Sequence, residues 1–266
     1  FYESFLAEDL DAFQISADFA QGIYALGEAL EAASRKLPFV KVQTTGPITF
    51  GLAIVDENKR AIYYNPEFVD VVVKGMAMKC RWQIRRFKPY AEEVICFLDE
   101  PILSAFGSST YVSVTRDDVV TRLNEVVEAI HAEGALAGIH CCGNTDWSMV
   151  IDAGVDIVNF DAFDYGETIA LYPEAVKKLL DAGKVLAWGI VPTNADKIRA
   201  QTVESLVAKL DELVDNLART AQIERGLILD RAIVTPSCGM GSTPLAEAEQ
   251  ALDLLTRTSQ ALRQRL

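Results

Sequence analysis

The stretch TRDDVVTRLNEVVEAIHAEGALAGIHCCGN, residues 115–144, decides the fold because it contains a complete helix and the strand that follows it. Thr115 is an N-cap residue type, and Asp117 and Asp118 in the first turn after it suit the positive end of a helix dipole. Gly134 is the residue type that most often ends a helix. The run Leu136–His140 is apolar without alternating polar residues, which is typical of a strand covered on both faces.

The same pattern recurs along the chain. Compact apolar runs predict five more strands: Val40–Thr45, Val94–Leu98, Val155–Phe160, Val185–Ile190 and Ala232–Thr235. Asn65-Pro66 opens a helix, since Asn is a good N-cap and Pro is favoured at the first helical position. Gly154 and Gly183 end two further helices. Repeated strand–helix units indicate an α/β fold with a parallel sheet.

The spacing of the strands favours a (β/α)8 TIM barrel. The predicted strand starts, from residue 40 to residue 232, lie on average about 38 residues apart, and an eight-stranded barrel needs two more units. The helical residues before the first strand are too few to hold them. We therefore expect that the first one or two βα units, roughly 50–80 residues, are missing from this chain. Residues 1–266 are then expected to form a single barrel domain. An open doubly wound sheet is the alternative.

The composition excludes several classes of protein. The formal net charge is −13, whereas nucleic acids and anionic membranes are bound by basic faces. No apolar run approaches the ~20 residues of a membrane-spanning helix. The 5 Cys, an odd number in a chain of 266 residues, indicate a reduced, cytoplasmic protein in which Cys serves metal binding or catalysis. Cys80, within a helix, and Cys96, within a strand, are expected in the core.

Residues with metal-binding side chains follow two of the predicted strands. The carboxyl ends of parallel strands form the functional face of α/β proteins. His140 and Cys142 are two residues apart, so in an extended chain their side chains point to the same side, and Cys238 follows another strand. Imidazole and thiolate ligands suit Zn²⁺ in a tetrahedral site. The three residues are therefore predicted zinc ligands, the alternative being that the Cys residues are small hydrophobic core residues.

Carboxylates follow two strand ends. Asp161 comes directly after Val155–Phe160 and is placed to reach the same ion, the alternative being a helix cap or a solvated loop residue. Asp99 and Glu100 follow Val94–Leu98 and need a partner, because burying unpaired charge is costly. A substrate ammonium group would serve, and a salt bridge to a Lys or Arg of the fold is the alternative.

Four motifs resemble the superfamily that joins cobalamin-independent methionine synthases to uroporphyrinogen decarboxylases. They are TTGPIT at residues 44–49, FLDEP at 97–101, HCCGN at 140–144 and TPSCG at 235–239, and they run through most of the chain. The Gly-Pro-Ile-Thr element is shared across the superfamily. The Asp-Glu-Pro, His-x-Cys and Cys-Gly elements together favour the zinc methyltransferase branch over the decarboxylases, which use no metal. The resemblance implies a (β/α)8 barrel.

The resemblance also implies roles for individual residues. The His and Cys of the family's His-x-Cys element and the Cys of its Cys-Gly element are zinc ligands, and they correspond to His140, Cys142 and Cys238. The family's fourth ligand is a Glu at the end of the next strand, a position that falls on the shorter Asp161. The Asp that holds the amino group of homocysteine in methionine synthases corresponds to Asp99.

The activity implied by the resemblance is zinc-dependent transfer of a methyl group to a thiol such as homocysteine, as in methionine biosynthesis. Folate-dependent methionine synthases carry a His in the loop after the strand equivalent to Val185–Ile190, where this chain has Val191-Pro192 and no His nearby. A methyl-corrinoid or corrinoid protein is therefore favoured as the donor over methyltetrahydrofolate. The alternatives are a metal-free lyase of the decarboxylase type and a non-catalytic protein that binds metal or corrinoid.

Overall fold

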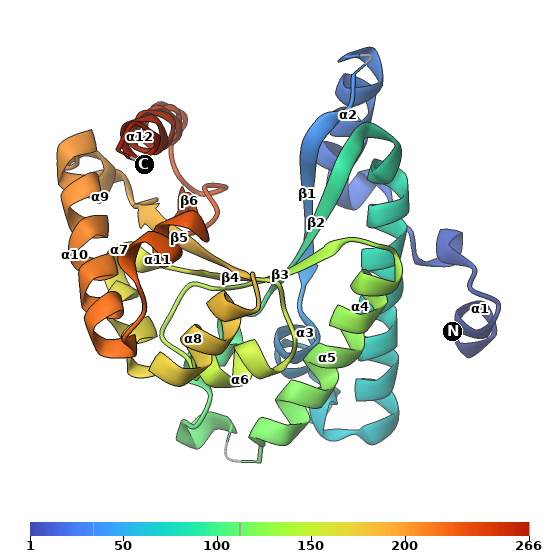
Figure 1. The fold of residues 1–266 in the computed structure, drawn as a ribbon. Helices are drawn as coiled ribbons and strands as arrows, with labels where there is room; N and C mark the ends of the chain where they lie inside the picture. The colour runs from blue at the N-terminus through green and yellow to red at the C-terminus, as the bar shows by residue number, and fades with distance from the viewer. Residues whose placement is uncertain (34, 112, 266) are drawn as a thin grey trace. The chain divides into compact units, whose positions relative to one another are not determined.

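The computed structural model describes residues 1–266 except 34, 112 and 266, and the chain forms an α/β fold (Figure 1). Within these residues, six parallel strands lie in the sheet in the order in which they occur in the chain. They are β1 (Leu37–Thr45), β2 (Ala91–Asp99), β3 (Leu136–Cys141), β4 (Ile157–Phe160), β5 (Val185–Val191) and β6 (Ala232–Pro236). All the predicted strands are confirmed, and parallel strands in chain order are the arrangement of consecutive units of a (β/α)8 barrel.

Helices connect the strands. The longer ones are α2 (Ala17–Ala33), α4 (Pro66–Phe87), α5 (Arg116–Ala132), α8 (Pro173–Asp181), α10 (Val203–Ala221) and α12 (Leu245–Arg263). The shorter ones are α1 (Tyr2–Leu6), α3 (Pro47–Ala53), α6 (Trp147–Asp152), α7 (Ala162–Tyr165), α9 (Ala195–Arg199) and α11 (Arg225–Asp230). Short 3-10 helices are η1 (Leu10–Phe13), η2 (Ile62–Tyr64), η3 (Lys88–Tyr90), η4 (Pro101–Ala105), η5 (Ser109–Tyr111) and η6 (Gly166–Leu171). In the described part of the chain, no helix has the length and apolar character of a membrane span.

The helices begin and end at the capping residues that the sequence predicted. The Asn65 side chain accepts a hydrogen bond from the Glu67 backbone N–H at 3.0 Å, at the start of α4. At the other end of such helices, Gly134, Gly154 and Gly183 have φ angles of +68°, +90° and +78°. A residue with a Cβ atom is strained in this left-handed conformation, so glycine ends each of these helices.

The chain divides into two compact units, the first of which contains residues 1–140 and 153–155. In this unit β1 pairs with β2 and β2 with β3, so that Asp99 lies opposite Thr45 on one side and His140 on the other. Helix α4 contacts β1, β2 and α5 and forms the core with them. Cys80 and Cys96 are fully buried there, which confirms their prediction as core residues.

The prediction that every strand is covered on both faces is wrong for β1, and also for β6, in which no residue is buried. Val40 and Val42 are buried, whereas Lys41 and Gln43, which follow each of them in turn, are exposed. The reason is that polar residues alternate with valines along this strand, so one face joins the core and the other remains accessible. The polar face of β1 therefore adjoins the strand end that carries Asp99.

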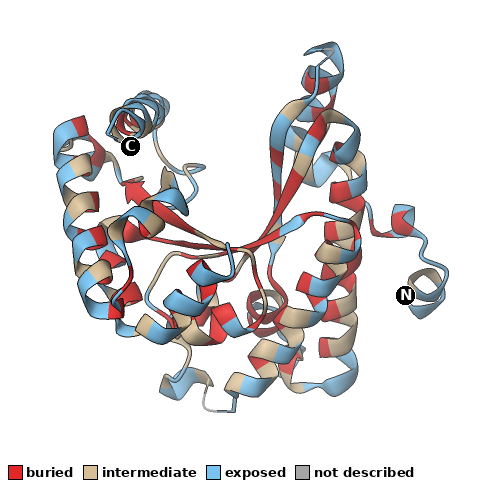
Figure 2. Ribbon diagram, in the orientation of Figure 1, coloured by how far each residue is buried: buried red, intermediate tan, exposed pale blue. Residues whose placement is uncertain are grey.

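The second unit contains residues 141–152 and 156–266. Here β4 pairs with β5 and β5 with β6, and β4 and β5 are almost wholly buried (Figure 2). The Phe160 ring lies between two indoles, with centroids 5.7 Å from Trp147 and 5.1 Å from Trp188. This aromatic cluster is enclosed in the core of the unit and holds the ends of β4 and β5 in place.

Candidate metal centre

Three of the predicted zinc ligands lie together. One ligand atom from each of His140, Cys142 and Cys238 lies within 4.8 Å of the other two. His140 and Cys142 flank the end of β3, where the extended chain turns both side chains to one side, and Cys141 between them is buried. Among the described residues, no other group of three His, Cys, Asp or Glu side chains meets this distance criterion.

Cys238 follows a strand end that packs tightly against Gly189 of β5. The register between the two strands shifts between Gly189 and Val191, and the Ser237 backbone N–H donates to the Val191 carbonyl at 2.8 Å. A Cβ atom on Gly189 would lie 2.5 Å from the Phe160 carbonyl oxygen and 2.8 Å from the Ser237 Cα. Glycine at position 189 thus allows Ser237, the residue before Cys238, to lie close to β5.

The loop after β6 is tied to the loop after β5 by polar contacts. The Thr243 hydroxyl donates to the Thr193 carbonyl at 2.8 Å, and the Thr193 and Ser237 hydroxyl oxygens lie 3.5 Å apart. Ser237 is buried, while the neighbouring Cys238 is exposed. The sulfur that the sequence predicted as a ligand therefore sits on a fixed backbone yet remains accessible.

The donor set suits a thiophilic divalent cation. Burial raises the pKa of the Cys142 thiol, and the neighbouring Cys238 and Asp161 raise it further. Two neighbouring thiols disfavour each other's ionised forms, and a cation held by the sulfurs reverses this effect. One imidazole and two thiols are ligands that Zn²⁺ prefers in proteins. The residues present therefore fit zinc.

Asp161 lies outside the group of three. Its Oδ1 accepts a hydrogen bond from the Asp164 backbone N–H at 2.9 Å and caps α7. The side chain is buried, and burial raises its pKa against the opposing effect of that N–H. This is the helix-cap alternative considered from the sequence, and the charge of Asp161 contributes to the raised pKa of Cys142. Its role as a fourth ligand stays a prediction.

Asp99 ends β2 in partly buried surroundings. Its Oδ2 accepts a hydrogen bond from the Gln43 side-chain amide at 3.0 Å. Burial raises the pKa of Asp99, and the neighbouring His140 and Lys41 oppose that shift. The carboxylate thus lies beside a predicted metal ligand on an accessible strand face, and its contact with a substrate amino group stays a prediction.

Glu100 has surroundings that the sequence analysis did not anticipate. The side chain is completely buried, and its two oxygens accept hydrogen bonds from the backbone N–H groups of Ile48 at 2.9 Å and Thr49 at 2.7 Å. Burial raises the pKa of Glu100 to about 7. Because both oxygens hold the first turn of α3, Glu100 links the Gly-Pro-Ile-Thr motif to the Asp-Glu-Pro motif. A direct contact between Glu100 and substrate stays a prediction.

Sequence reasoning missed three residues around Asp99. They are Lys41 and Gln43 on β1 and Phe97 on β2, and the Lys41 Nζ lies 4.7 Å from the centroid of the Phe97 ring. One signal was available in the sequence, because Lys41 is the only Lys or Arg within the three strands β1, β2 and β3. A charged residue between Val40 and Val42 marked this position as unusual.

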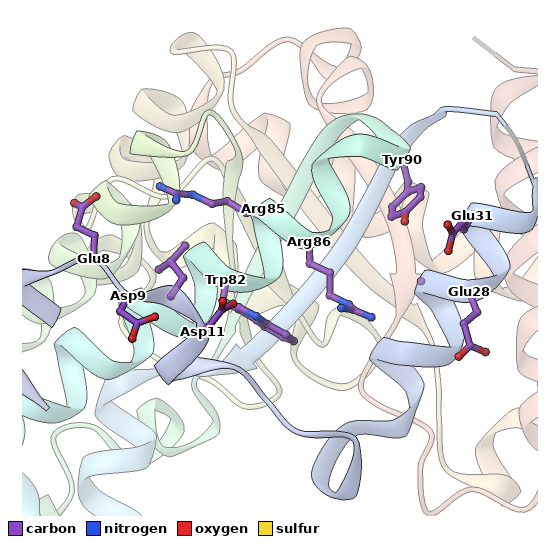
Figure 3. A pocket seen from close by; sticks show the side chains of 11 residues that line it. Glu8, Asp9, Asp11, Glu28, Glu31, Trp82, Arg85, Arg86 and Tyr90 are labelled. Atoms are coloured by element: carbon purple, nitrogen blue, oxygen red, sulfur yellow. The ribbon is translucent and has the colours of Figure 1, made fainter. Parts of the chain in front are cut away.

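A large pocket elsewhere in the first unit has no part in this centre. Its volume is about 740 Å³, and none of the predicted site residues lines it. Figure 3 shows acidic side chains around it together with Arg85 and Arg86, and the Arg86 guanidinium lies over the rings of Tyr24 and Trp82. Its lining comes from α2, α4, the segment around η1 and Tyr90 of η3, and includes no residue from the carboxyl end of a strand.

Comparison with known proteins supports the fold. No protein family matches the chain, and no curated protein matches it in sequence. Among solved structures, a methyltransferase from Methanosarcina mazei is similar to it with 14% sequence identity and a TM-score of 0.59. The match covers 91% of this chain and 67% of that protein. The chain is therefore distantly similar in fold to a methyltransferase, and it carries a candidate His/Cys/Cys metal site.

Proposed function

We propose that this protein is a zinc-dependent methyltransferase whose methyl acceptor is a thiol such as homocysteine. The observation that supports this most directly is the meeting of His140, Cys142 and Cys238 within 4.8 Å of one another at the ends of β3 and β6. The donor set is typical of zinc, and its position at strand ends is that of functional sites in α/β proteins. The distant similarity in fold to a methyltransferase agrees with this proposal.

The chemistry requires a nucleophilic sulfur. Bound zinc would supply Lewis acidity that lowers the pKa of an acceptor thiol and so provides a thiolate at neutral pH. The Cys142 and Cys238 thiolates would balance the charge of a divalent ion, while neutral His140 adds no charge. In the transfer, the acceptor sulfur forms a bond to the methyl carbon as the donor–methyl bond breaks. The donor keeps the bonding electron pair, and the thiol proton passes to water.

Two carboxylates complete the proposed site. Asp99 orients the ammonium group of an amino-acid thiol, since its carboxylate lies on an accessible strand face beside His140. Asp161 serves as the fourth, most easily displaced ligand, because a carboxylate oxygen binds zinc less strongly than a thiolate does. As the methyl donor we favour a methyl-corrinoid over methyltetrahydrofolate, since the loop after β5 carries no His.

Metal analysis of matched variants tests the proposal. The purified protein is expected to hold about one zinc per chain, and Cys142→Ala and Cys238→Ala should lose it. Cys141→Ala is the matched control, because Cys141 lies beside Cys142 but is buried away from the group. A metal-free protein that keeps its fold in all variants would favour the decarboxylase type of lyase.

Activity separates an enzyme from a binding protein. Methylcobalamin should be demethylated in the presence of homocysteine, and the product should be methionine. Methyltetrahydrofolate in place of methylcobalamin tests the other donor. Zinc binding without transfer from either donor to any thiol would favour a non-catalytic metal-binding protein.

A further inference from the structure

One face of the β1–β2–β3 sheet gathers polar and charged side chains. Gln43 lies opposite Phe97, and Phe97 lies opposite Gly138 on the next strand. Because side chains two apart on a strand share a face, Lys41 lies on the face of Gln43, and Asp99 lies on the face of Phe97. This face therefore leads from Lys41 towards the strand end that carries Asp99.

Because Gly138 has no side chain, the Phe97 ring has room to lie beneath Lys41. A Cβ atom on Gly138 would lie 2.5 Å from the Phe97 ring, so the ring occupies the space that a side chain at position 138 would need. The Lys41 ammonium lies 4.7 Å from the centroid of the same ring, within the range of a cation–π interaction. The ring thus supports a cation at a defined place on the sheet.

The side-chain amide of Gln43 lies between the Lys41 ammonium and the Asp99 carboxylate. Lys41 Nζ donates a hydrogen bond to Gln43 Oε1, and Gln43 Nε2 donates to Asp99 Oδ2 at 3.0 Å. Among the described residues, no ion pair within 4.0 Å joins Lys41 to Asp99. Opposite charges are therefore held one amide group apart, with Lys41 and Gln43 both exposed on this face.

The surroundings make an anion the favoured partner of this ammonium. Burial of part of the side chain lowers the pKa of Lys41, and the neighbouring Asp99 opposes that shift, so the exposed ammonium is stabilised by nearby negative charge. The chain carries a net charge of −13, which repels an anionic ligand in general. An acid group would therefore be bound where a local cation is presented, and Lys41 is the only Lys or Arg of these three strands.

We propose that Lys41 is a specificity-determining residue that binds the acid group of the thiol acceptor, with Phe97 and Gln43 holding its ammonium in place. This inference rests on the proposed methyl transfer to a thiol. It narrows the acceptor to thiols that carry an anionic group, either a carboxylate or a sulfonate. An ammonium–carboxylate hydrogen bond is the kind of contact whose loss weakens binding strongly.

The test compares acidic and neutral thiols in the Lys41→Met variant. The KM for 3-mercaptopropionate should rise by about tenfold or more, while kcat/KM for 3-mercapto-1-propanol should change by less than about twofold. Lys41→Arg should keep most of the preference for the acidic thiol, since the charge remains. Lys177→Met removes an exposed lysine paired with Asp181 on α8 and is the control for net charge. A parallel series with 2-mercaptoethanesulfonate distinguishes a sulfonate from a carboxylate preference.

Equilibrium binding separates this inference from the proposed function. Calorimetric titration with 3-(methylthio)propanoate, which carries no thiol to be methylated, should give about tenfold weaker binding to Lys41→Met than to the unmodified protein. Such a loss would support the inference even if no methyl transfer occurred with any thiol. If Lys41→Met still transfers the methyl group, and the ratio of the KM for the acidic thiol to the KM for the neutral thiol is unchanged, the inference is overturned. The proposed function would then remain supported. If Lys41→Met does not fold, Lys41→Gln takes its place in the same comparison.

Discussion

The Glu100 carboxylate occupies the space that a side chain on Gly46 would need, because a Cβ atom there would lie 2.1 Å from Glu100 Oε1. Gly46 precedes α3, and the two Glu100 oxygens accept hydrogen bonds from the first turn of that helix. One buried carboxylate thus joins the ends of β1 and β2 beside Asp99. The arrangement explains why a glycine stands before Pro47.

Replacement of Gly46 by alanine is expected to destabilise the fold. The added methyl group collides with a fully buried carboxylate that has little freedom to move, and overpacking of this kind costs about 1–3 kcal/mol. The free energy of unfolding in urea measures the effect. Gly239→Ala is the control, since its added Cβ would meet no atom within 4 Å. Equal stability of the two variants would contradict the packing described.

The titration of Glu100 predicts a pH dependence of stability. Its pKa is about 7 in the folded protein and ordinarily 4.5, so the folded state binds more protons than the unfolded state between these values. The resulting stabilisation is fully present below pH 4.5 and is lost as the pH rises through about 7, a change of about 3 kcal/mol.

Glu100→Gln removes this contribution, so its free energy of unfolding should fall less between pH 4.5 and pH 7.5 than that of the unmodified protein. Glu92→Gln, at an exposed position on β2, the strand that precedes Glu100, should keep the original slope. Parallel curves for all three proteins would show that Glu100 does not titrate in this range.

Replacement of Gly189 by alanine is expected to impair metal binding more than folding. The new Cβ meets the Phe160 carbonyl oxygen at the end of β4 and the Ser237 Cα after β6, which can give way only if both strand ends move, and Cys238 moves with Ser237. Zinc affinity should fall by about tenfold or more, since ligand geometry at a tetrahedral site is strict. Competition with a chromogenic chelator measures this affinity. In Gly226→Ala the added Cβ meets nothing within 4 Å, so unchanged affinity is expected there.

Variants of Asp161 distinguish a helix cap from a metal ligand. Asn caps helices about as well as Asp, so Asp161→Asn should keep the stability of the protein, whereas Asp161→Ala should lose about 1 kcal/mol. If Asp161 supplies the fourth zinc ligand as we predict, Asp161→Asn should still lower zinc affinity by about tenfold, because a carboxylate is replaced by a neutral amide. Unchanged zinc affinity in Asp161→Asn would leave Asp161 as a cap alone.

The sequence by itself determined the α/β class, the positions of the strands and three residues of the candidate site. Strands such as β4 and β5 are marked by local apolar runs, and helix ends such as Gly134 by a residue type with a special backbone preference, so neighbouring residues suffice to predict them. His140, Cys142 and Cys238 could be grouped because parallel strands bring their carboxyl ends to one edge.

Only the tertiary structure decided which polar groups at those strand ends are neighbours. Glu100 and Asp99 are adjacent in the sequence, yet Glu100 is enclosed against α3 while Asp99 bonds to Gln43 on another strand. Lys41 comes to lie over Phe97 because Gly138, on a third strand, leaves room for the ring. Such contacts depend on strand register and on side-chain volume at distant positions, and no local pattern of residues encodes them.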